Sequence, residues 1–224
     1  MMPVLPSTLL LLTLWSGTEA EAPSSKPEPP SKSRQGLNSE DDTWLQPVSE
    51  DVWKTSELAY DLSLPDTIYG ELKVRYGDMT VARDTMVMPT ATSEAPEVSL
   101  KGAINCMPPF ALVMVDPDVP SREQPTERSR VHWMVLNANS TERLHEGEEA
   151  VPYSGPSPPE GTGPHRYVFL AYCQSGKWVS SDDIAPKRRN KFELGDFAAN
   201  LNAGNAFGGT FFYAENANQY GRNL

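Results

Sequence analysis

The chain has 224 residues, of which 38% are hydrophobic, and this length and composition allow one domain with one hydrophobic core. Its formal net charge of -11 and the lack of a Lys/Arg stripe exclude nucleic acid as an expected partner, because a phosphate polymer would be repelled. The 21 prolines fall into a leading segment and a set of later loops.

The first residues have the pattern of a secretory signal. Residues 9–15 form a short apolar run, and Thr18 and Ala20 are small residues at the positions that signal peptidase reads. We therefore predict a signal peptide over residues 1–20 and a secreted, extracellular protein. The alternative is an unstructured apolar N-terminus, since no Lys or Arg precedes the run. The run is too short to span a bilayer, and no later segment predicts a transmembrane anchor.

The next segment, residues 21–43, consists mostly of Pro, Ser, Lys and Glu. Such a composition cannot offset the entropy lost on ordering, so we predict a disordered leader. Apolar content returns at Trp44 and Leu45. We therefore predict a single domain over residues 44–224.

Within this domain, strand patterns dominate. A short helix or turn is expected over residues 58–64, and one amphipathic helix over residues 191–201. Alternating or continuous apolar residues predict strands over residues 72–76, 98–100, 110–115, 132–136, 167–172 and 210–213. Several strands, long Pro-rich loops and few helices indicate a β-sandwich.

Candidate chemical groups occur where these strands begin or end. Asp116 and Asp118 follow a buried strand in a Pro-stiffened loop, and we expect one carboxylate to face a pocket while the other braces the loop. The alternative is that both are turn residues. His132 and His165 each open an apolar strand, whereas His145 lies in a polar stretch and is expected to be solvated.

The stretches around these residues closely resemble the phosphatidylethanolamine-binding protein family, which includes Raf kinase inhibitor protein and the plant flowering regulators. The matching stretches are DPDVPSR at 116–122, HWMV at 132–135, GPSPP at 155–159 and GTGPHRYVF at 161–169. Weaker similarity continues from Lys191 to Glu215, so the resemblance covers roughly the whole region after the leader. It implies a mainly β fold, an antiparallel β-sandwich of one large and one smaller sheet with a few peripheral helices.

The resemblance also implies a small pocket for phosphate-like groups at one end of the sandwich. Imidazole N–H and tyrosine O–H groups can donate to phosphate oxygens, and prolines would form an apolar wall. The aspartates would orient or charge the histidines, or accept from the ammonium of ethanolamine. The ligand-binding residues carried over by motif are Asp116, Asp118, Pro120, His132, Pro158, Pro159, His165 and Tyr167.

Three positions depart from the family pattern at the rim of this pocket. Val131 stands where a second histidine is frequent, and Arg130 and Glu127 stand where aromatic residues are common. These changes alter the rim and are expected to tune ligand choice. Tyr220 is a candidate for the C-terminal tyrosine of the family pocket, but the match is poor there.

We expect a monomeric, non-catalytic binding protein without a cofactor, whose partner is a phosphorylated small molecule or a phospholipid head group. Such a protein would bind lipids or modulate signalling. The alternative is an inhibitor of a protease or kinase acting through the pocket rim. A metal-dependent hydrolase built on His132, His165 and Asp116 is a further alternative, because two histidines and a carboxylate can hold iron or zinc. The sequence lacks the His-Glu-x-x-His spacing that would favour it.

Two covalent modifications are also predicted. Cys106 lies ten positions before Asp116, and Cys173 lies eight positions after His165. If Asp116 and His165 share the pocket, both cysteines lie at a similar depth and can form a disulfide. Two separately buried thiols are the alternative. Asn139 begins an Asn-Ser-Thr glycosylation sequon, which is usable only if exposed in the secretory lumen.

Overall fold

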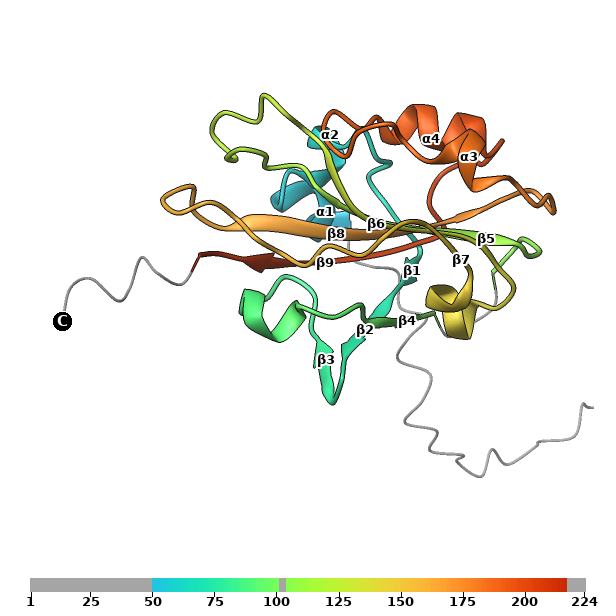
Figure 1. Ribbon diagram of the computed structural model, residues 1–224, viewed down its shortest axis with the longest axis horizontal. Helices are drawn as coiled ribbons and strands as arrows, with labels where there is room; N and C mark the ends of the chain where they lie inside the picture. Colours follow the sequence, from blue (N-terminus) through green and yellow to red (C-terminus); the bar gives the residue numbers. More distant parts are fainter. Residues whose placement is uncertain (1–49, 101–103, 217–224) are drawn as a thin grey trace, which may run out of the picture. The chain divides into compact units, whose positions relative to one another are not determined.

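The computed structural model describes residues 50–100 and 104–216, which form two β-sheets with short helices (Figure 1). The larger sheet has the strand order β1-β9-β8-β5-β6-β7, and the smaller sheet has the order β3-β2-β4. The predicted fold class, mainly β with a large and a smaller sheet, is confirmed. One pairing differs from a purely antiparallel arrangement, because β1 runs parallel to β9 and makes the large sheet mixed.

The large sheet contains β1 (Gly70–Glu71), β5 (Phe110–Asp116), β6 (Arg130–Ala138), β7 (Glu148–Val151), β8 (His165–Cys173) and β9 (Gly208–Ala214). The small sheet contains β2 (Lys73–Tyr76), β3 (Met79–Val81) and β4 (Glu97–Ser99). The helical elements are α1 (Glu50–Thr55), α2 (Leu58–Asp61), η2 (Pro89–Thr92), η3 (Thr141–Glu146), α3 (Ser181–Ile184) and α4 (Leu194–Asn200). The predicted signal peptide, the predicted leader over residues 21–43, the start of the predicted domain at residue 44 and Tyr220 lie outside the described residues.

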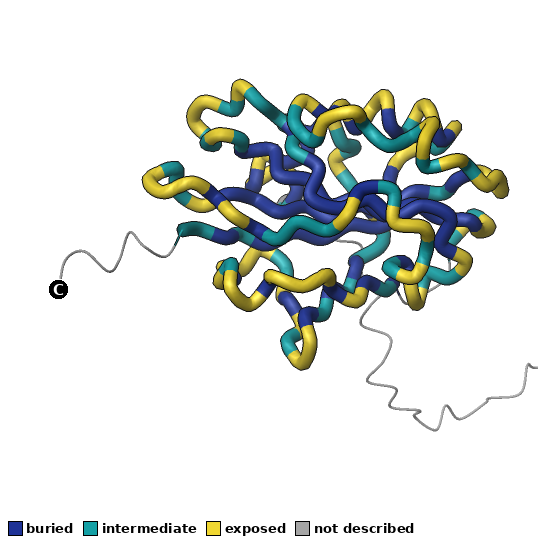
Figure 2. The backbone as a smooth tube through the Cα atoms, viewed as in Figure 1, coloured by how far each residue is buried: buried dark blue, intermediate teal, exposed yellow. Residues whose placement is uncertain are grey.

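The centre of the large sheet is buried on both faces. Every residue of β5 is buried, as are nearly all residues of β6 and β8 (Figure 2). Continuous apolar runs are what such central strands require, because a residue on either face meets packed side chains. The strands predicted from these runs are therefore present, with ends displaced by a few residues.

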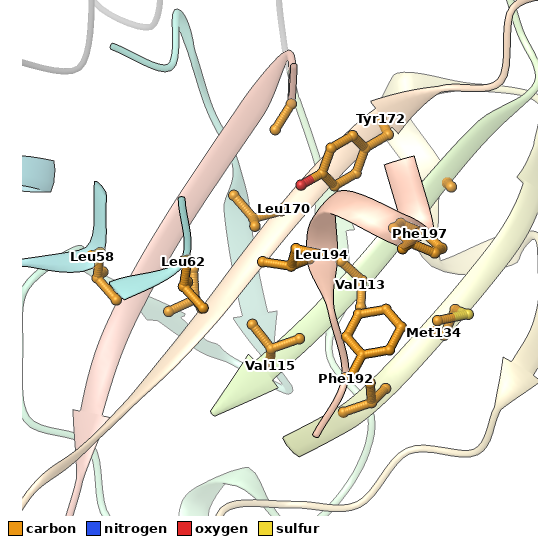
Figure 3. Packing of buried hydrophobic residues seen from close by; sticks show 14 of the residues in the cluster. Leu58, Leu62, Val113, Val115, Met134, Leu170, Tyr172, Phe192, Leu194 and Phe197 are labelled. Atoms are coloured by element: carbon orange, nitrogen blue, oxygen red, sulfur yellow. The ribbon is translucent and has the colours of Figure 1, made fainter. Parts of the chain in front are cut away.

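Two hydrophobic cores form, one on each face of the large sheet. Figure 1 shows the α-helices over one face and the small sheet over the other. On the helix side, Leu58, Leu194 and Phe197 pack against strand residues such as Val113 and Leu170 (Figure 3). The other core joins Leu72, Val74 and Val98 of the small-sheet layer to the opposite face of the same strands. Burying each large side chain contributes about 1.5–3 kcal/mol, so both faces stabilise the strands that carry the site.

The predicted helix over residues 191–201 is shorter in the structure. Helix α4 begins at Leu194, because Lys191 has a φ of 58°, in the left-handed region that a right-handed helix cannot include. Phe192 is still buried in the helix-side core. The apolar pattern therefore predicted the burial of this residue correctly but predicted a helix that is too long.

Candidate functional site

The candidate site lies where β5 ends and β6 and β8 begin. Asp116 is the last residue of β5, and its partner in the antiparallel ladder is Arg130, the first residue of β6. On the other side of β5, Val115 pairs with Val168, which places the start of β8 beside the end of β5. The register thus brings Asp116, His132 and His165 to the same end of the three strands.

A β-bulge in β6 directs His132 toward the small-sheet face. The β5–β6 register shifts between Met114, which faces Trp133, and Val115, which faces Val131. Val131 packs in the helix-side core, while Trp133 packs in the opposite core, although residues two apart in a regular strand share a face. The extra residue is His132, whose ring meets that of Tyr167 edge-on with 5.1 Å between centroids. Bulges of this kind commonly redirect side chains near functional sites.

Asp116 and His165 form a buried pair. His165 Nδ1 donates to Asp116 Oδ2 at 2.8 Å, and the other carboxylate oxygen accepts from the backbone N–H of Asp118 at 2.7 Å. The second ring nitrogen of His165, Nε2, lies 2.9 Å from the hydroxyl of Thr162. Asp116 therefore fixes the orientation of the His165 ring.

His132 has one satisfied and one unsatisfied nitrogen. Its Nδ1 donates to the carbonyl oxygen of Ser154 at 2.6 Å, while Nε2 is buried and has no hydrogen-bond partner among the described residues. Burial lowers the pKa of His132 to about 4, and the positive charges of Arg130 and Arg189 act in the same direction. The negative charge of Asp116 opposes this effect without overcoming it. At neutral pH, His132 is uncharged, and its Nε2 carries a lone pair.

Tyr167 completes the buried group. Burial is the main cause that raises its pKa well above the ordinary value, and the negative charge of Asp116 adds to the effect. The phenol therefore keeps its proton at any physiological pH and can act as a donor. A backbone hydrogen bond joins Tyr167 to Ser157.

The segment at 152–164 contacts each of these side chains. Its Ser154 bonds to His132, Ser157 to Tyr167, and Thr162 to His165. As a result, Asp116, His132, His165 and Tyr167 are only 2%, 1%, 1% and 0% exposed. A ligand can reach these side chains only after part of the surrounding structure moves. Outside Thr162 lies an open hollow of about 610 Å³, lined also by Met86, Arg122, Glu123, Gly163, Pro164 and Tyr213.

Asp118 does not share this environment. Its carboxylate is fully buried and accepts from the Nε of Arg166 at 2.8 Å and from the backbone N–H of Arg166 at 2.9 Å. Arg166 also bridges to Asp61 of α2 and to the carbonyl of Ser56. The structure therefore places Asp118 against Arg166, in the position expected of the carboxylate that braces the loop, and its contact with a ligand stays a prediction.

The predicted prolines lie around the site with different exposure. Pro158 is buried, whereas Pro120 and Pro159 are exposed. The buried Pro158 lies in the segment that contacts the histidines, and the other two lie at the surface. Only Pro158 therefore fits the predicted apolar wall.

Several site residues were not singled out from the sequence. Thr162 and Arg166 stand inside the GTGPHRYVF stretch, and their proximity to His165 is the signal that could have identified them. Ser154 contributes only a backbone carbonyl, for which the residue type gives no signal. Arg189 lies 57 residues after His132 and donates to its carbonyl oxygen at 3.1 Å. Such a long-range contact requires the folded structure.

The alternative metal site finds no support in the donor geometry. Among the described residues, no three His, Cys, Asp or Glu side chains are arranged to hold a metal ion. Asp116 and His165 are bonded to each other, and His132 Nδ1 is bonded to Ser154.

The two cysteines are joined at the opposite end of β5 and β8. Cys106 and Cys173 form a disulfide with 6.3 Å between their Cα atoms. Cys173 is the ladder partner of Phe110, the first residue of β5, which explains why the segment before β5 reaches it. The alternative of two separate thiols is thus not what the structure contains. Asn139 is exposed after the end of β6.

Sequence comparison identifies the family. The family described as phosphatidylethanolamine-binding protein matches residues 70–212, which include both β-sheets except the last two residues of β9, and the buried histidines. The chain belongs to this family. Among curated relatives, MOTHER of FT and TFL1 homolog 2 from Oryza sativa is 34% identical over 139 residues, covering 62% of this chain and 76% of the relative. FLOWERING LOCUS T from Arabidopsis thaliana is 35% identical over 141 residues, covering 63% and 77%.

Solved structures agree with this assignment. A carboxypeptidase Y inhibitor, determined in complex with its cognate proteinase, aligns with a TM-score of 0.63 and 28% identity, over 74% of this chain and 94% of that one. A phosphatidylethanolamine-binding protein from Plasmodium vivax aligns with a TM-score of 0.57 over 75% and 98%, and its 21% identity supports the fold alone.

The prediction of a secreted, extracellular protein is wrong. The curated relatives are plant proteins of the FLOWERING LOCUS T type, a group that is typically intracellular and not secreted. A short apolar run can mimic a signal peptide when read alone, and this run lacks the basic residues that normally precede it. Within the described ranges, no helix has the length and hydrophobicity needed to cross a membrane.

Proposed function

We propose that this phosphatidylethanolamine-binding protein family member is a non-catalytic binding protein. It binds a phosphate group of a small molecule or of a phospholipid head group. The residues that bind this group are His132, His165 and Tyr167. The observation that carries the proposal is His132 Nε2, which is buried without a hydrogen-bond partner among the described residues. Leaving such an atom unsatisfied costs about 1–3 kcal/mol, and a ligand that bonds to it recovers this energy.

The neighbouring groups suit an oxygen-rich ligand. The Tyr167 phenol is a donor, and His165 Nε2 becomes available if the ligand displaces Thr162. His132 can accept from a protonated phosphate oxygen, or take up a proton and donate to an unprotonated one. Proton uptake would link binding to pH, because a bound anion raises the pKa of His132 from its value of about 4.

The environment of Asp116 favours a binding role over a catalytic role for this site. Both of its oxygens are already engaged, one with His165 and one with the backbone N–H of Asp118. A general base needs access to the proton that it removes, and Asp116 is only 2% exposed. Its role in the proposal is to orient His165.

Calorimetry with phosphoethanolamine between about pH 4.5 and pH 7.5 tests the proposal. We expect affinity to rise as pH falls, since protonated His132 attracts phosphate. His132→Asn should weaken binding and flatten this dependence, while His145→Asn on η3 should leave both unchanged. Affinity that rises with pH, or equal binding by the His132→Asn protein, would contradict the proposal.

A second candidate function is inhibition of a peptidase through the rim. It is favoured by the structural likeness to the carboxypeptidase Y inhibitor, which was determined with its proteinase bound. The exposed Pro120 and Pro159 are rim groups that a partner could contact. Titrating carboxypeptidase Y with the folded chain would test it, and unchanged peptide hydrolysis at a tenfold excess would count against it.

A further inference from the structure

Two arginines lie beside His132 at the start of β6. Arg130 is two residues before His132 and is the ladder partner of Asp116. Arg189 lies in a later segment that runs along the same strand, since the N–H of Val131 donates to the Arg189 carbonyl oxygen at 2.8 Å. Both side chains are partly buried, so their charges are only partly screened by water.

The Arg189 side chain is held by backbone groups. Its Nη1 donates to the carbonyl oxygens of Val131 at 3.2 Å and His132 at 3.1 Å, and its Nη2 donates to that of Pro152 at 2.8 Å. These contacts join β6 to the segment that covers the site. The guanidinium is therefore fixed in place next to His132.

Arg130 is held less tightly and keeps donors available. Its Nη1 donates to the Asn190 side chain at 2.8 Å. Across residues 50–100 and 104–216, neither Arg130 nor Arg189 has a carboxylate within ion-pair distance, in contrast to Arg166 and Arg128. A guanidinium has five N–H donors, so Arg130 can bind a further acceptor.

The two positive charges act on each other and on the site. Burial and the charge of Arg130 lower the pKa of Arg189, the charge of Glu149 opposes them in part, and both arginines lower the pKa of His132. Arg130 also acts on Tyr167. Two like charges with no carboxylate at ion-pair distance are unfavourable when partly buried, and an anion bound beside them would relieve the repulsion.

We propose that Arg130 and Arg189 form an anion subsite beside His132, and that the ligand is a phosphomonoester and not a zwitterionic phosphodiester. This inference rests on the proposed function and assigns its ligand class. A phosphomonoester has three terminal oxygens, so one can meet Arg130 while the others meet Tyr167 and the histidines. The ammonium of a zwitterionic head group would instead approach two guanidinium groups. Both oxygens of Asp116 already accept a hydrogen bond, one from His165 and one from the N–H of Asp118, so this carboxylate is not free to pair with the ammonium.

Calorimetry at neutral pH with glycerol 3-phosphate and glycerophosphoethanolamine compares the two classes directly. We expect the monoester to bind at least about tenfold more tightly, the usual effect of one charged hydrogen bond. Arg130→Gln retains a hydrogen-bond donor for Asn190. Its affinity for the monoester should fall about tenfold, and its affinity for the diester should change little. Arg143→Gln, an exposed position on η3, removes the same charge as a control and should change neither affinity.

The outcomes separate this inference from the proposed function. If neither compound binds the wild-type chain, both proposals fail. If both bind equally, or if Arg130→Gln leaves monoester affinity unchanged, the subsite is overturned while phosphate binding stands. Should Arg130→Gln fold poorly, Arg130→Lys, which keeps the charge, must retain most of the preference. Binding to vesicles that contain phosphatidic acid is then compared with binding to vesicles of phosphatidylethanolamine. Preferential binding to the phosphatidic acid vesicles would indicate a lipid monoester, and no vesicle binding would indicate a free one.

Discussion

Lowering the pH from 7 to 4 should destabilise the fold through His132. In the unfolded chain this imidazole takes up a proton near pH 6.5, whereas in the folded chain its pKa is lowered to about 4, chiefly by burial. Between these values the unfolded chain binds more protons than the folded chain. The free energy of unfolding therefore falls as the pH drops through this window and levels off below about pH 4.

The size of the effect follows from the two pKa values. A change from 6.5 to about 4 in the pKa of His132 is worth about 3 kcal/mol. Solvent screening removes little of it, because the side chain is only 1% exposed. That is a large part of the typical stability of a domain. The loss should be detectable by urea unfolding followed by tryptophan fluorescence.

The assay compares wild type with His132→Asn at several pH values. Carboxylates titrate in both proteins, so the difference between the two curves isolates His132. Wild type should lose about 3 kcal/mol relative to the variant between pH 7 and pH 4. His145→Asn should follow the wild-type curve. A difference between wild type and His132→Asn that stays constant with pH would refute the reasoning.

Three other variants test the framework of the site. Arg166→Met leaves the buried Asp118 carboxylate with only the more distant Arg128, at 3.9 Å, and should cost about 3–5 kcal/mol in urea unfolding; a loss below about 1 kcal/mol would contradict this. Cys173→Ser opens the bond to Cys106, which spans 67 residues, and should cost about 4 kcal/mol, whereas a reductant should then have no further effect. A chain without residues 1–43 should unfold at the same urea concentration as the full chain, and aggregation or loss of β-sheet circular dichroism would show that the segment is needed.

The sequence was most informative where one physical requirement dominates. The continuous apolar run before Asp116 predicts a strand buried on both faces, and β5 is such a strand. The resemblance implies one pocket for Asp116 and His165, and the structure joins these two side chains by a hydrogen bond. The start of α4 at Leu194 was not predictable, because the residue type of Lys191 does not indicate its positive φ.

The roles of the two aspartates could not be assigned from the sequence. Asp116 and Asp118 have the same functional group and almost the same local context. Their difference arises from partners 48 or 49 residues away, Arg166 for one and His165 for the other. The low pKa of His132 was also missed, since the sequence suggested that nearby aspartates would raise it. Burial outweighs the charge of Asp116, and the extent of burial depends on the segment that covers the ring.

The adjacent residues His165 and Arg166 connect the site to the helices through the two faces of β8. His165 lies on the small-sheet face with Asp116, while Arg166 lies on the helix face with Asp61 and the carbonyl of Ser56. Asp118 accepts from Arg166, and its backbone N–H donates to Asp116, which closes a chain of hydrogen bonds from α2 to the histidine. Every member except Asp61 is buried, and each is hydrogen-bonded to the next, so we expect a displacement of α2 to alter the environment of Asp116. The position of His165 therefore depends on how the helices pack, although no helix contributes a side chain that touches it directly among the hydrogen bonds of the described residues.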